Sequence, residues 1–359
     1  MIPSDDRPAE PDTSADRSSR PTVTVVMPVR NEEGFIDAAV RSVLDQDYPA
    51  ALLDIVVAEG SSTDRTRAIL ERIVADEPRV RIVDNPEQIV STGLNRAIAQ
   101  ARGEIIIRID GHCDIDRDFV RASAEVLAEH PEAWVVGGPI RHAATTAFGR
   151  AVAHAMSSPA GVGGASHRFE GYEGYSDSAQ FPAFRRTVFD RVGTFDVAQV
   201  RNQDDELNFR ITQAGGKIYV SPRIGYRYYV RERPRQLFRQ YYQYAFWRIP
   251  MLRKHRRPTT VRQLIPPLFY LTMAVGVVAG LVLRKPRIAF ALPAAYGGVL
   301  AAVGVHSLGT LDPAAAARVP AAVAILHASY ASGWAVGFWS TAFRPDAWSA
   351  DGSMSALSR

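Results

Sequence analysis

Cysteine is almost absent from this sequence, and so are two other features that would place it in a common protein class. Cys113 is the only cysteine among 359 residues, which excludes an intramolecular disulfide and a zinc site built from several cysteines. Residues 1–20 contain no apolar run and therefore cannot act as a secretory signal. The sequence also lacks the glycine-rich, lysine-containing loop that binds phosphate in many nucleotide enzymes. We expect residues 1–20 to be a disordered lead and the domain that follows to stay in the cytosol.

Acidic and basic side chains are separated along the chain. Residues 1–226 carry 34 acidic and 25 basic side chains, whereas residues 227–262 carry 11 basic and one acidic. Residues 263–359 carry only nine charged side chains. A nucleic-acid-binding protein would spread its positive charge over the folded domain itself, so nucleic acid is not expected as a partner. An acidic head followed by a basic segment and an apolar tail is typical of a domain held against a membrane.

Short apolar strands alternate with helical stretches from residue 21 to about residue 230. Near-continuous β-branched runs predict strands covered on both faces of a sheet, and they lie at Val23–Val29, Leu53–Ala58, Val80–Val83 and Glu104–Ile109. Helical periods occupy the intervals between them, at Glu33–Gln46, Thr63–Ala75 and Ile89–Ala101. This alternation predicts right-handed βαβ units in an α/β domain, residues 21–230. Ligands bind beyond the carboxyl ends of such strands, so the residues that follow each strand are the candidate site.

The C-terminal part, residues 263–342, consists mainly of three uncharged apolar stretches, at 264–283, 288–308 and 319–341. Each has the roughly 20 residues needed to cross a bilayer core. Before them lies the collar, residues 231–262, where arginines alternate with aromatic side chains. This composition suits a helix at the membrane interface, although the aromatics could also pack in an ordinary core.

The collar cations predict a multi-pass protein of the inner membrane with a cytoplasmic head, three crossings and a tail, residues 343–359. The loop that holds Arg284, Lys285 and Arg287 would then lie outside, which the same rule disfavours. A shallow hairpin of the first two stretches that does not fully cross is therefore the alternative.

Asp110 and His112 follow the fourth predicted strand and form a candidate metal site. A carboxylate and an imidazole two residues apart on a strand-end turn can both reach one divalent cation. Mg²⁺ or Mn²⁺ held there would neutralise a diphosphate leaving group. Asp114 and Asp116 form a second candidate pair, which we disfavour because it lies past the strand end, near the start of the next helix.

Two further acidic groups are candidates for binding or proton transfer. Glu59 precedes small residues and a helix start, so its carboxylate could accept a base N–H or a ribose hydroxyl; a polar turn with Thr63 as helix cap explains the pattern equally well. Asp204, Asp205 and Glu206 lie together at the start of a predicted helix, where the helix dipole favours acids. Mutual repulsion among three carboxylates should make at least one of them more basic, and it could accept the proton of an attacking hydroxyl.

Together these segments resemble glycosyltransferase family 2, whose members have the GT-A fold and invert the configuration of the transferred sugar. The matching segments cover residues 22–215 in order, and they read VTVVMPVRNEE, DIVVAEGSSTDRT, GLNRAIAQARGEIIIRIDGH, AFRRTVFDRVGTFD and RNQDDELNFR. With its three trailing apolar stretches, the chain looks most like the succinoglycan-type glucosyltransferases that build exopolysaccharide repeat units on a lipid carrier. The Gln-Arg-x-x-Arg-Trp motif of processive synthases is missing, which argues for one transfer per encounter.

The resemblance implies roles for individual residues. Asp204 would be the general base, and His112 would replace the second carboxylate of the family's Asp-x-Asp motif at the metal. Gln203 stands where the family has the glutamate of a Glu-Asp pair, and Glu59 stands where it has an aspartate. Together with His112, these departures leave metal and nucleotide preference open. The residues implied to bind the donor nucleotide sugar are Pro28, Arg30, Glu32, Glu59 and Asp110.

The expected function is that of a membrane-anchored inverting glycosyltransferase. The donor is expected to be a nucleotide sugar, with UDP as the best assignment, and the acceptor a lipid-linked saccharide or a polysaccharide. Other polysaccharide-assembly proteins are possible partners. A nucleotidyltransferase and a non-catalytic nucleotide-sugar-binding subunit of an assembly complex are the alternatives. The residues predicted on the acceptor side are Asp177, Asp205, Glu206 and Trp247.

Overall fold

The structure is a computed structural model that describes residues 20–343. Almost all of the predicted N-terminal lead, and the tail beyond Phe343, lie outside the described residues.

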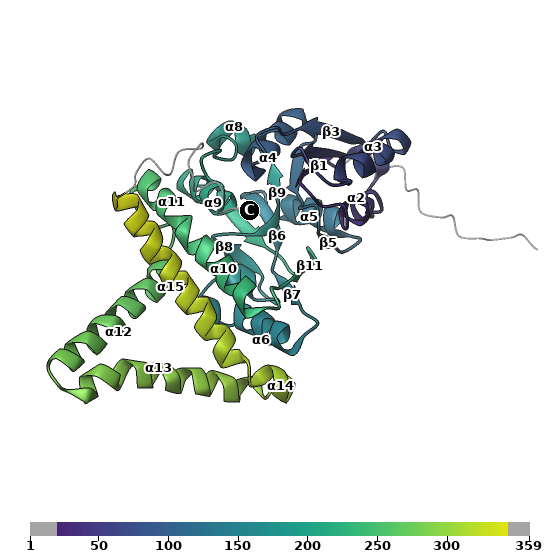
Figure 1. Cartoon of the computed structure of the whole chain (residues 1–359). Helices are drawn as coiled ribbons and strands as arrows, with labels where there is room; N and C mark the ends of the chain where they lie inside the picture. Colours follow the sequence, from purple (N-terminus) through teal and green to yellow (C-terminus); the bar gives the residue numbers. More distant parts are fainter. Residues whose placement is uncertain (1–19, 344–359) are drawn as a thin grey trace, which may run out of the picture.

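An eight-stranded mixed sheet forms the head, in the order β3-β2-β1-β4-β9-β6-β10-β8 (Figure 1). Strands β1 to β4 pair in parallel, whereas β9 is antiparallel to both β4 and β6. Strand β10 is parallel to β6 and antiparallel to β8. The bounds are β1 Val23–Val29, β2 Leu53–Glu59, β3 Val80–Asp84, β4 Ile105–Arg108, β6 Ala133–Gly138, β8 Gly174–Ser176, β9 Gln180–Arg185 and β10 Lys217–Val220. The four predicted strands are therefore confirmed to within one or two residues.

Helices cover both faces of this sheet, which explains why its strands are apolar on both sides. One face packs residues of α2, α3 and α5, and the other packs residues of α4, α8 and α9. These helices are α2 Ile36–Leu44, α3 Thr66–Asp76, α4 Val90–Gln100, α5 Phe119–Glu129, α8 Thr187–Val192 and α9 Gln203–Gln213. In β1 and β2, Val29 is paired with Glu59, so both strands end at the same edge, where the predicted site residues follow.

A second, three-stranded sheet lies beside the head in the order β5-β11-β7. Its strands are β5 Asp114–Ile115, β7 Arg141–Ala143 and β11 Tyr226–Tyr229. Three short helices and turns complete this region, α6 Ala147–Met156, α7 Pro159–Val162 and η2 Ser166–Arg168, and η1 Ala50–Leu52 precedes β2.

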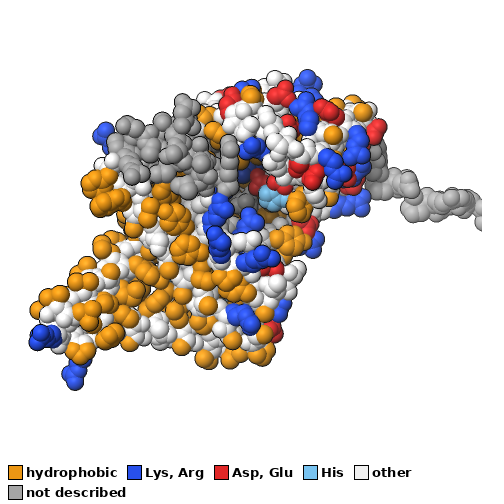
Figure 2. Space-filling view, viewed as in Figure 1, with side chains coloured by type: hydrophobic (Ala, Val, Ile, Leu, Met, Phe, Trp, Pro, Cys, Tyr) orange, Lys and Arg blue, Asp and Glu red, His pale blue; other side chains and the backbone are white. Residues whose placement is uncertain are grey.

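The C-terminal segment forms helices along one side of the head (Figure 1). They are α10 Pro234–Phe246, α11 Arg248–His255, η3 Val261–Leu264, α12 Ile265–Val282, α13 Pro286–Ser307, α14 Pro313–Ala316 and α15 Val319–Phe343. Three helical segments are long and apolar enough to cross a membrane, Val261–Val282, Pro286–Ser307 and Pro313–Phe343. In Figure 1, α12 and α13 form a V whose open end rests on α15. Figure 2 shows hydrophobic side chains over this part of the molecule, with Lys and Arg at the tip of the V.

Candidate active site

A cavity of about 1330 Å³ lies between the edge of the main sheet and the C-terminal helices. Its walls come from the segments after β1 and β4, from the start of α9, and from α10, α12 and α15. Typical small-molecule pockets measure about 300–1,000 Å³, so this one has room for two substrates side by side. The predicted site residues among its lining are Pro28, Arg30, Glu32, Asp110, His112, Asp204 and Asp205.

Arg108, the last residue of β4, joins Asp110 to Asp204. Its Nη2 donates to Oδ1 of Asp110 at 3.0 Å, and its Nη1 donates to Oδ1 of Asp204. The arginine side chain is only 8% exposed. A planar guanidinium with five N–H groups can hold two carboxylates in fixed positions. The structure thus brings together two acids that lie far apart in the sequence, on one wall of the cavity.

The environment of Asp204 makes this carboxylate a better proton acceptor. Burial raises the pKa of Asp204, and the positive charge of Arg108 opposes but does not cancel that shift. Its Oδ1 accepts the bond from Arg108, and among residues 20–343 no hydrogen bond to its Oδ2 is found. Asn202, in the left-handed region with φ of 58°, precedes α9 and donates from Nδ2 to the carbonyl of Tyr244 at 2.8 Å. That bond fixes the start of α9 against α10, with Asp204 at the cavity wall.

His112 and Glu32 connect the loops that follow β4 and β1. Nδ1 of His112 lies 3.0 Å from Oε1 of Glu32, and this hydrogen bond raises the pKa of the imidazole. A Cβ atom at Gly111 would lie 2.9 Å from Cγ1 of Val29. Glycine at this position therefore allows the two loops to approach closely enough for the His112–Glu32 contact.

Asp110 and His112 fit a divalent cation as a partial set of ligands. In the described part of the chain, no group of three or more His, Cys, Asp or Glu side chains is arranged to hold a metal ion. Because Glu32 occupies Nδ1 of His112, Nε2 remains available to bind a metal ion. In metal sites the other ring nitrogen of a ligating histidine is usually hydrogen-bonded to a carboxylate, as Nδ1 is here. Mg²⁺ is often held by one or two protein side chains together with substrate phosphates. These two residues would therefore need a bound diphosphate to complete the coordination.

Glu59 does not line the cavity. Its side chain is 5% exposed, its Oε1 accepts a hydrogen bond from the backbone N–H of Ser62 at 2.7 Å, and its Oε2 lies 3.7 Å from Nη1 of Arg67. In this structure Glu59 stabilises the turn after β2, as the polar-turn alternative expects. Thr63 is not the helix cap of that alternative, because α3 begins at Thr66 and is preceded by Arg65. Its contact with a nucleotide stays a prediction.

Of the four residues predicted on the acceptor side, Asp205 is the one found in the cavity lining. Its Oδ2 accepts from Nη2 of Arg248 at 2.7 Å, which joins α9 to α11. Asp177 accepts from Arg262 at 2.6 Å. Arg262 itself lines the cavity, so Asp177 lies one side chain behind the wall.

Glu206 and Trp247 are both buried in packed regions outside the cavity lining. The Glu206 side chain is fully buried, and its carboxylate accepts from Arg210 and from Lys254, at 2.8 Å and 2.6 Å. His255 Nε2 lies 3.0 Å from the same carboxylate. Trp247 is buried at the junction of α10 and α11. Neither side chain reaches the cavity, so a direct acceptor contact is not seen for either residue.

The disfavoured metal pair, Asp114 and Asp116, lies outside the cavity lining. Asp114 accepts from Nε of Arg227 at 2.9 Å, and Asp116 accepts from Nη1 of Arg141 at 2.7 Å. Both acids stabilise the three-stranded sheet, which supports the preference for Asp110 and His112.

The sequence analysis did not identify Arg108 or a group of arginines and tyrosines on the far wall of the cavity. Arg108 carries a detectable signal, since it is a charged residue in a strand that is otherwise apolar and covered on both faces. Arg168, Tyr228 and Tyr241 come from η2, β11 and α10. These three elements share no sequence pattern that would predict their convergence.

The comparisons with known proteins agree with the fold. The model for glycosyl transferase family 2 matches residues 24–193. The succinoglycan biosynthesis protein ExoA of Rhizobium meliloti (strain 1021) is 30% identical over 333 residues, which is 91% of this chain and 96% of ExoA. The dolichyl N-acetyl-alpha-D-glucosaminyl phosphate 3-beta-D-2,3-diacetamido-2,3-dideoxy-beta-D-glucuronosyltransferase of Methanococcus voltae is 24% identical over 240 residues, 65% of this chain and 74% of that protein.

One solved structure shares the fold over most of its length. It is the mannosyltransferase PcManGT from Pyrobaculum calidifontis, in complex with GDP-Man and Mn²⁺, with a TM-score of 0.56 and 21% identity over 88% of each chain. One assignment follows from the near-complete coverage of ExoA, the family match over residues 24–193 and the shared fold. The chain belongs to glycosyltransferase family 2 and is a glycosyltransferase.

Proposed function

We propose that this protein transfers a sugar, with inversion, from a nucleotide sugar to a lipid-linked or polysaccharide acceptor in the synthesis of a cell-surface polysaccharide. The Arg108 network carries the proposal, because it holds Asp110 and Asp204 on one wall of a cavity that can contain both substrates. The donor is assigned as UDP-linked from the sequence resemblance.

In the proposed reaction, Asp204 accepts the proton of the acceptor hydroxyl while the hydroxyl oxygen attacks the anomeric carbon. The bond from that carbon to the diphosphate breaks on the opposite face, and the nucleoside diphosphate leaves. Asp110 and His112 would hold Mg²⁺ or Mn²⁺, which supplies positive charge to the departing diphosphate. Pro28, Arg30 and Glu32 would position the nucleotide, and alignment of the two substrates provides much of the rate enhancement.

The proposal of a lipid-linked acceptor rests on the relatives and on the apolar helices. The name of the Methanococcus voltae relative describes a dolichyl-phosphate-linked acceptor, and that of ExoA describes succinoglycan biosynthesis. Helices α12 and α13 are about 27 Å and 33 Å long at 1.5 Å per residue, close to the thickness of a bilayer core. Only 6% of the most apolar window in each is buried. We infer that these two helices enter a membrane on whose cytoplasmic side the head lies.

Helix α15 differs from α12 and α13, because it packs along the head. Of its most apolar window, 39% is buried. Leu326 belongs to an apolar cluster with residues of α6 and α10, and a Cβ at Gly333 would clash with the backbone carbonyl of Tyr242 in α10. Just before α14, Asp312 is bonded to Arg150 of α6 at 2.9 Å. From Asp312 to Gly333 this segment thus lies against the head, which argues against a third crossing and for a membrane hairpin of α12 and α13.

The direct test of the proposed chemistry is Asp204→Asn in the purified full-length protein. Loss of a general base should lower sugar transfer, or donor hydrolysis without acceptor, by about 10²-fold or more. Binding of UDP with Mn²⁺ should be kept. Asp190→Asn, an exposed change on α8 away from the cavity, is the matched control. Turnover by Asp204→Asn within a few-fold of the Asp190→Asn protein would remove Asp204 from this role.

A further inference from the structure

The far wall of the cavity is strongly basic. Among the described residues, eight arginines and five carboxylates line the cavity. The carboxylates, among them Asp110 and Asp204, lie mainly at the edge of the main sheet. Most of the arginines lie on the far wall of the cavity. Six of them come from η2, the segment before α9 and the collar: Arg168, Arg201, Arg231, Arg239, Arg248 and Arg262.

Carboxylates of the protein neutralise only part of this charge. Arg248 is paired with Asp205, and Arg262 with Asp177. Arg168 and Arg231 form no ion pair with a carboxylate within residues 20–343. Arg168 donates a hydrogen bond from Nη1 to the hydroxyl of Tyr241, at 3.2 Å. A cation on a partly enclosed wall, bonded to a neutral partner, favours an anionic ligand.

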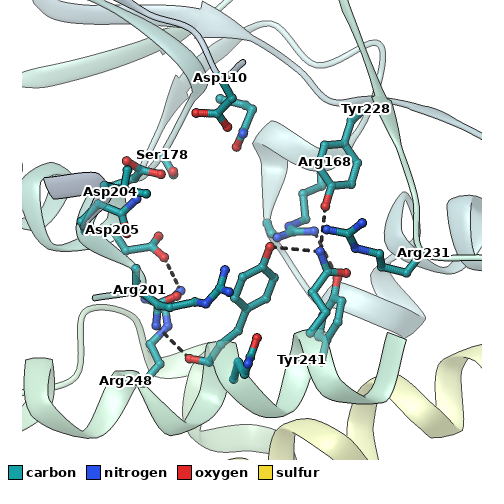
Figure 3. A pocket seen from close by; sticks show the side chains of 18 of the residues that line it. Asp110, Arg168, Ser178, Arg201, Asp204, Asp205, Tyr228, Arg231, Tyr241 and Arg248 are labelled. Carbon is teal, nitrogen blue, oxygen red and sulfur yellow. Dashed lines mark hydrogen bonds and ion pairs between the residues drawn. The ribbon is translucent and has the colours of Figure 1, made fainter. Parts of the chain in front are cut away.

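Tyrosine hydroxyls surround these arginines and add neutral donors. Burial raises the pKa of Tyr241 and Tyr244, so both stay protonated at neutral pH. Gln240 donates from Nε2 to the hydroxyl of Tyr228 at 2.8 Å and to that of Tyr244 at 3.3 Å. The hydroxyls of Tyr228 and Tyr244 thus each accept a hydrogen bond and can still donate their own proton to another acceptor. Figure 3 shows Tyr228 with Arg168 and Arg231 across the cavity from Asp204 and Asp205.

The cavity also reaches the apolar helices. Ile265 and Pro266 of α12 and Leu326 and Tyr330 of α15 belong to the same lining as the arginines. Ile265 is 62% exposed and belongs to the apolar surface of α12. A ligand on the arginines could therefore extend a hydrocarbon chain directly onto the surface that we assign to the membrane.

We propose that Arg168 and Arg231, with the Tyr228 and Tyr241 hydroxyls, bind the diphosphate of a polyprenyl-diphosphate-linked saccharide, the acceptor. This assignment rests on the proposed function, and it places the lipid toward α12 and α15 and the saccharide toward Asp204. Arginine and tyrosine donors match the several oxygen acceptors of a diphosphate. A donor nucleotide also carries a diphosphate, so the experiment must distinguish the two sources.

The test measures binding of farnesyl diphosphate to the full-length protein in detergent, with UDP and Mn²⁺ at saturating concentration. Farnesol, which has the same hydrocarbon and no phosphate, is the parallel probe. We expect Arg231→Gln and Arg168→Gln each to weaken farnesyl diphosphate binding about 10-fold or more, the usual effect of losing a hydrogen bond between charged groups. Binding of farnesol, and of UDP with Mn²⁺, should change less than twofold.

Arg227→Gln is the matched control, because Arg227 is exposed, lies in the same β11 region, pairs with Asp114 and does not line the cavity. Arg168 is partly enclosed, so its replacement could disturb folding. Arg231 is exposed, and the result for Arg231→Gln therefore does not depend on folding. Farnesyl diphosphate affinity in Arg231→Gln equal to that in Arg227→Gln would overturn the proposal. So would competition between UDP and farnesyl diphosphate, or a parallel loss of UDP affinity, since either would assign the arginines to the donor. Absence of donor hydrolysis by the unmodified protein would instead refute the proposed function.

Discussion

Replacing Arg108 with glutamine should move the acid limb of the pH–activity profile to higher pH. Arg108 is 8% exposed and bonds both Asp110 and Asp204. Glutamine keeps a polar donor of similar reach and removes the positive charge. In the proposed mechanism, Asp204 works only when it is deprotonated. Activity is therefore lost as pH falls through the pKa of Asp204, and a higher pKa moves that loss to higher pH.

The expected size follows from the charges that the structure places together. Two unit charges 4 Å apart attract by about 4 kcal/mol at an effective dielectric of 20. The side chains of Asp110 and Asp204 are 25% and 31% exposed, so water screens part of this attraction. An adjacent arginine usually lowers the pKa of an aspartate by about 1–3 units. Burial already raises the pKa of Asp204, and removal of the opposing charge should raise it further. We expect a shift of about 1–2 pH units.

The assay is donor hydrolysis or sugar transfer measured from mildly acidic to mildly alkaline pH for the unmodified protein and for two variants. Arg108→Lys keeps the charge and loses the planar fork, so its acid limb should stay near that of the unmodified protein while its rate falls. Arg108→Gln should show the shifted limb, provided that its melting temperature shows a folded protein at each pH. An unshifted limb in a folded Arg108→Gln protein would refute the electrostatic coupling between Arg108 and Asp204.

Two further predictions concern stability and topology. Glu206→Gln leaves Arg210 and Lys254 without a buried carboxylate, so the free energy of unfolding should fall by about 2–3 kcal/mol in a denaturant titration. Arg210 and Lys254 lower the pKa of Glu206, so the stability that this carboxylate contributes is present above the ordinary glutamate pKa and is lost as pH falls through the lowered value. A Glu206→Gln protein as stable as the unmodified protein at neutral pH would contradict the ion pairs of Glu206 with Arg210 and Lys254. For topology, the proposed hairpin keeps α15 on the cytoplasmic side with the head, so a green fluorescent protein fused after the C-terminus should fluoresce. An active alkaline phosphatase fusion would instead support three crossings.

The sequence predicted the sheet better than it predicted the cavity. Strands such as Val23–Val29 are buried on both faces, so their apolar runs are long and unambiguous. Asp110 and His112 follow such a strand directly, and the strand-end rule placed them at the right edge. Arg168 could not be found in this way, because it contacts Tyr241 only after η2 and α10 have packed together. The packing of α15 was equally hidden, since its composition is that of a membrane span and only its contacts with α10 and α6 distinguish it from α12.

The cavity combines three kinds of lining, which bears on how the two substrates meet. Carboxylates lie at the sheet edge, arginines and tyrosines lie across from them (Figure 3), and apolar side chains of α12 and α15 are also part of the lining. A lipid-linked acceptor carries the three matching groups, namely hydroxyls, phosphates and hydrocarbon. With its phosphates on Arg168 and its saccharide toward Asp204, such an acceptor leaves the surroundings of Asp110 to the donor. Both substrates can then be bound at once, which an inverting transfer in a single displacement requires.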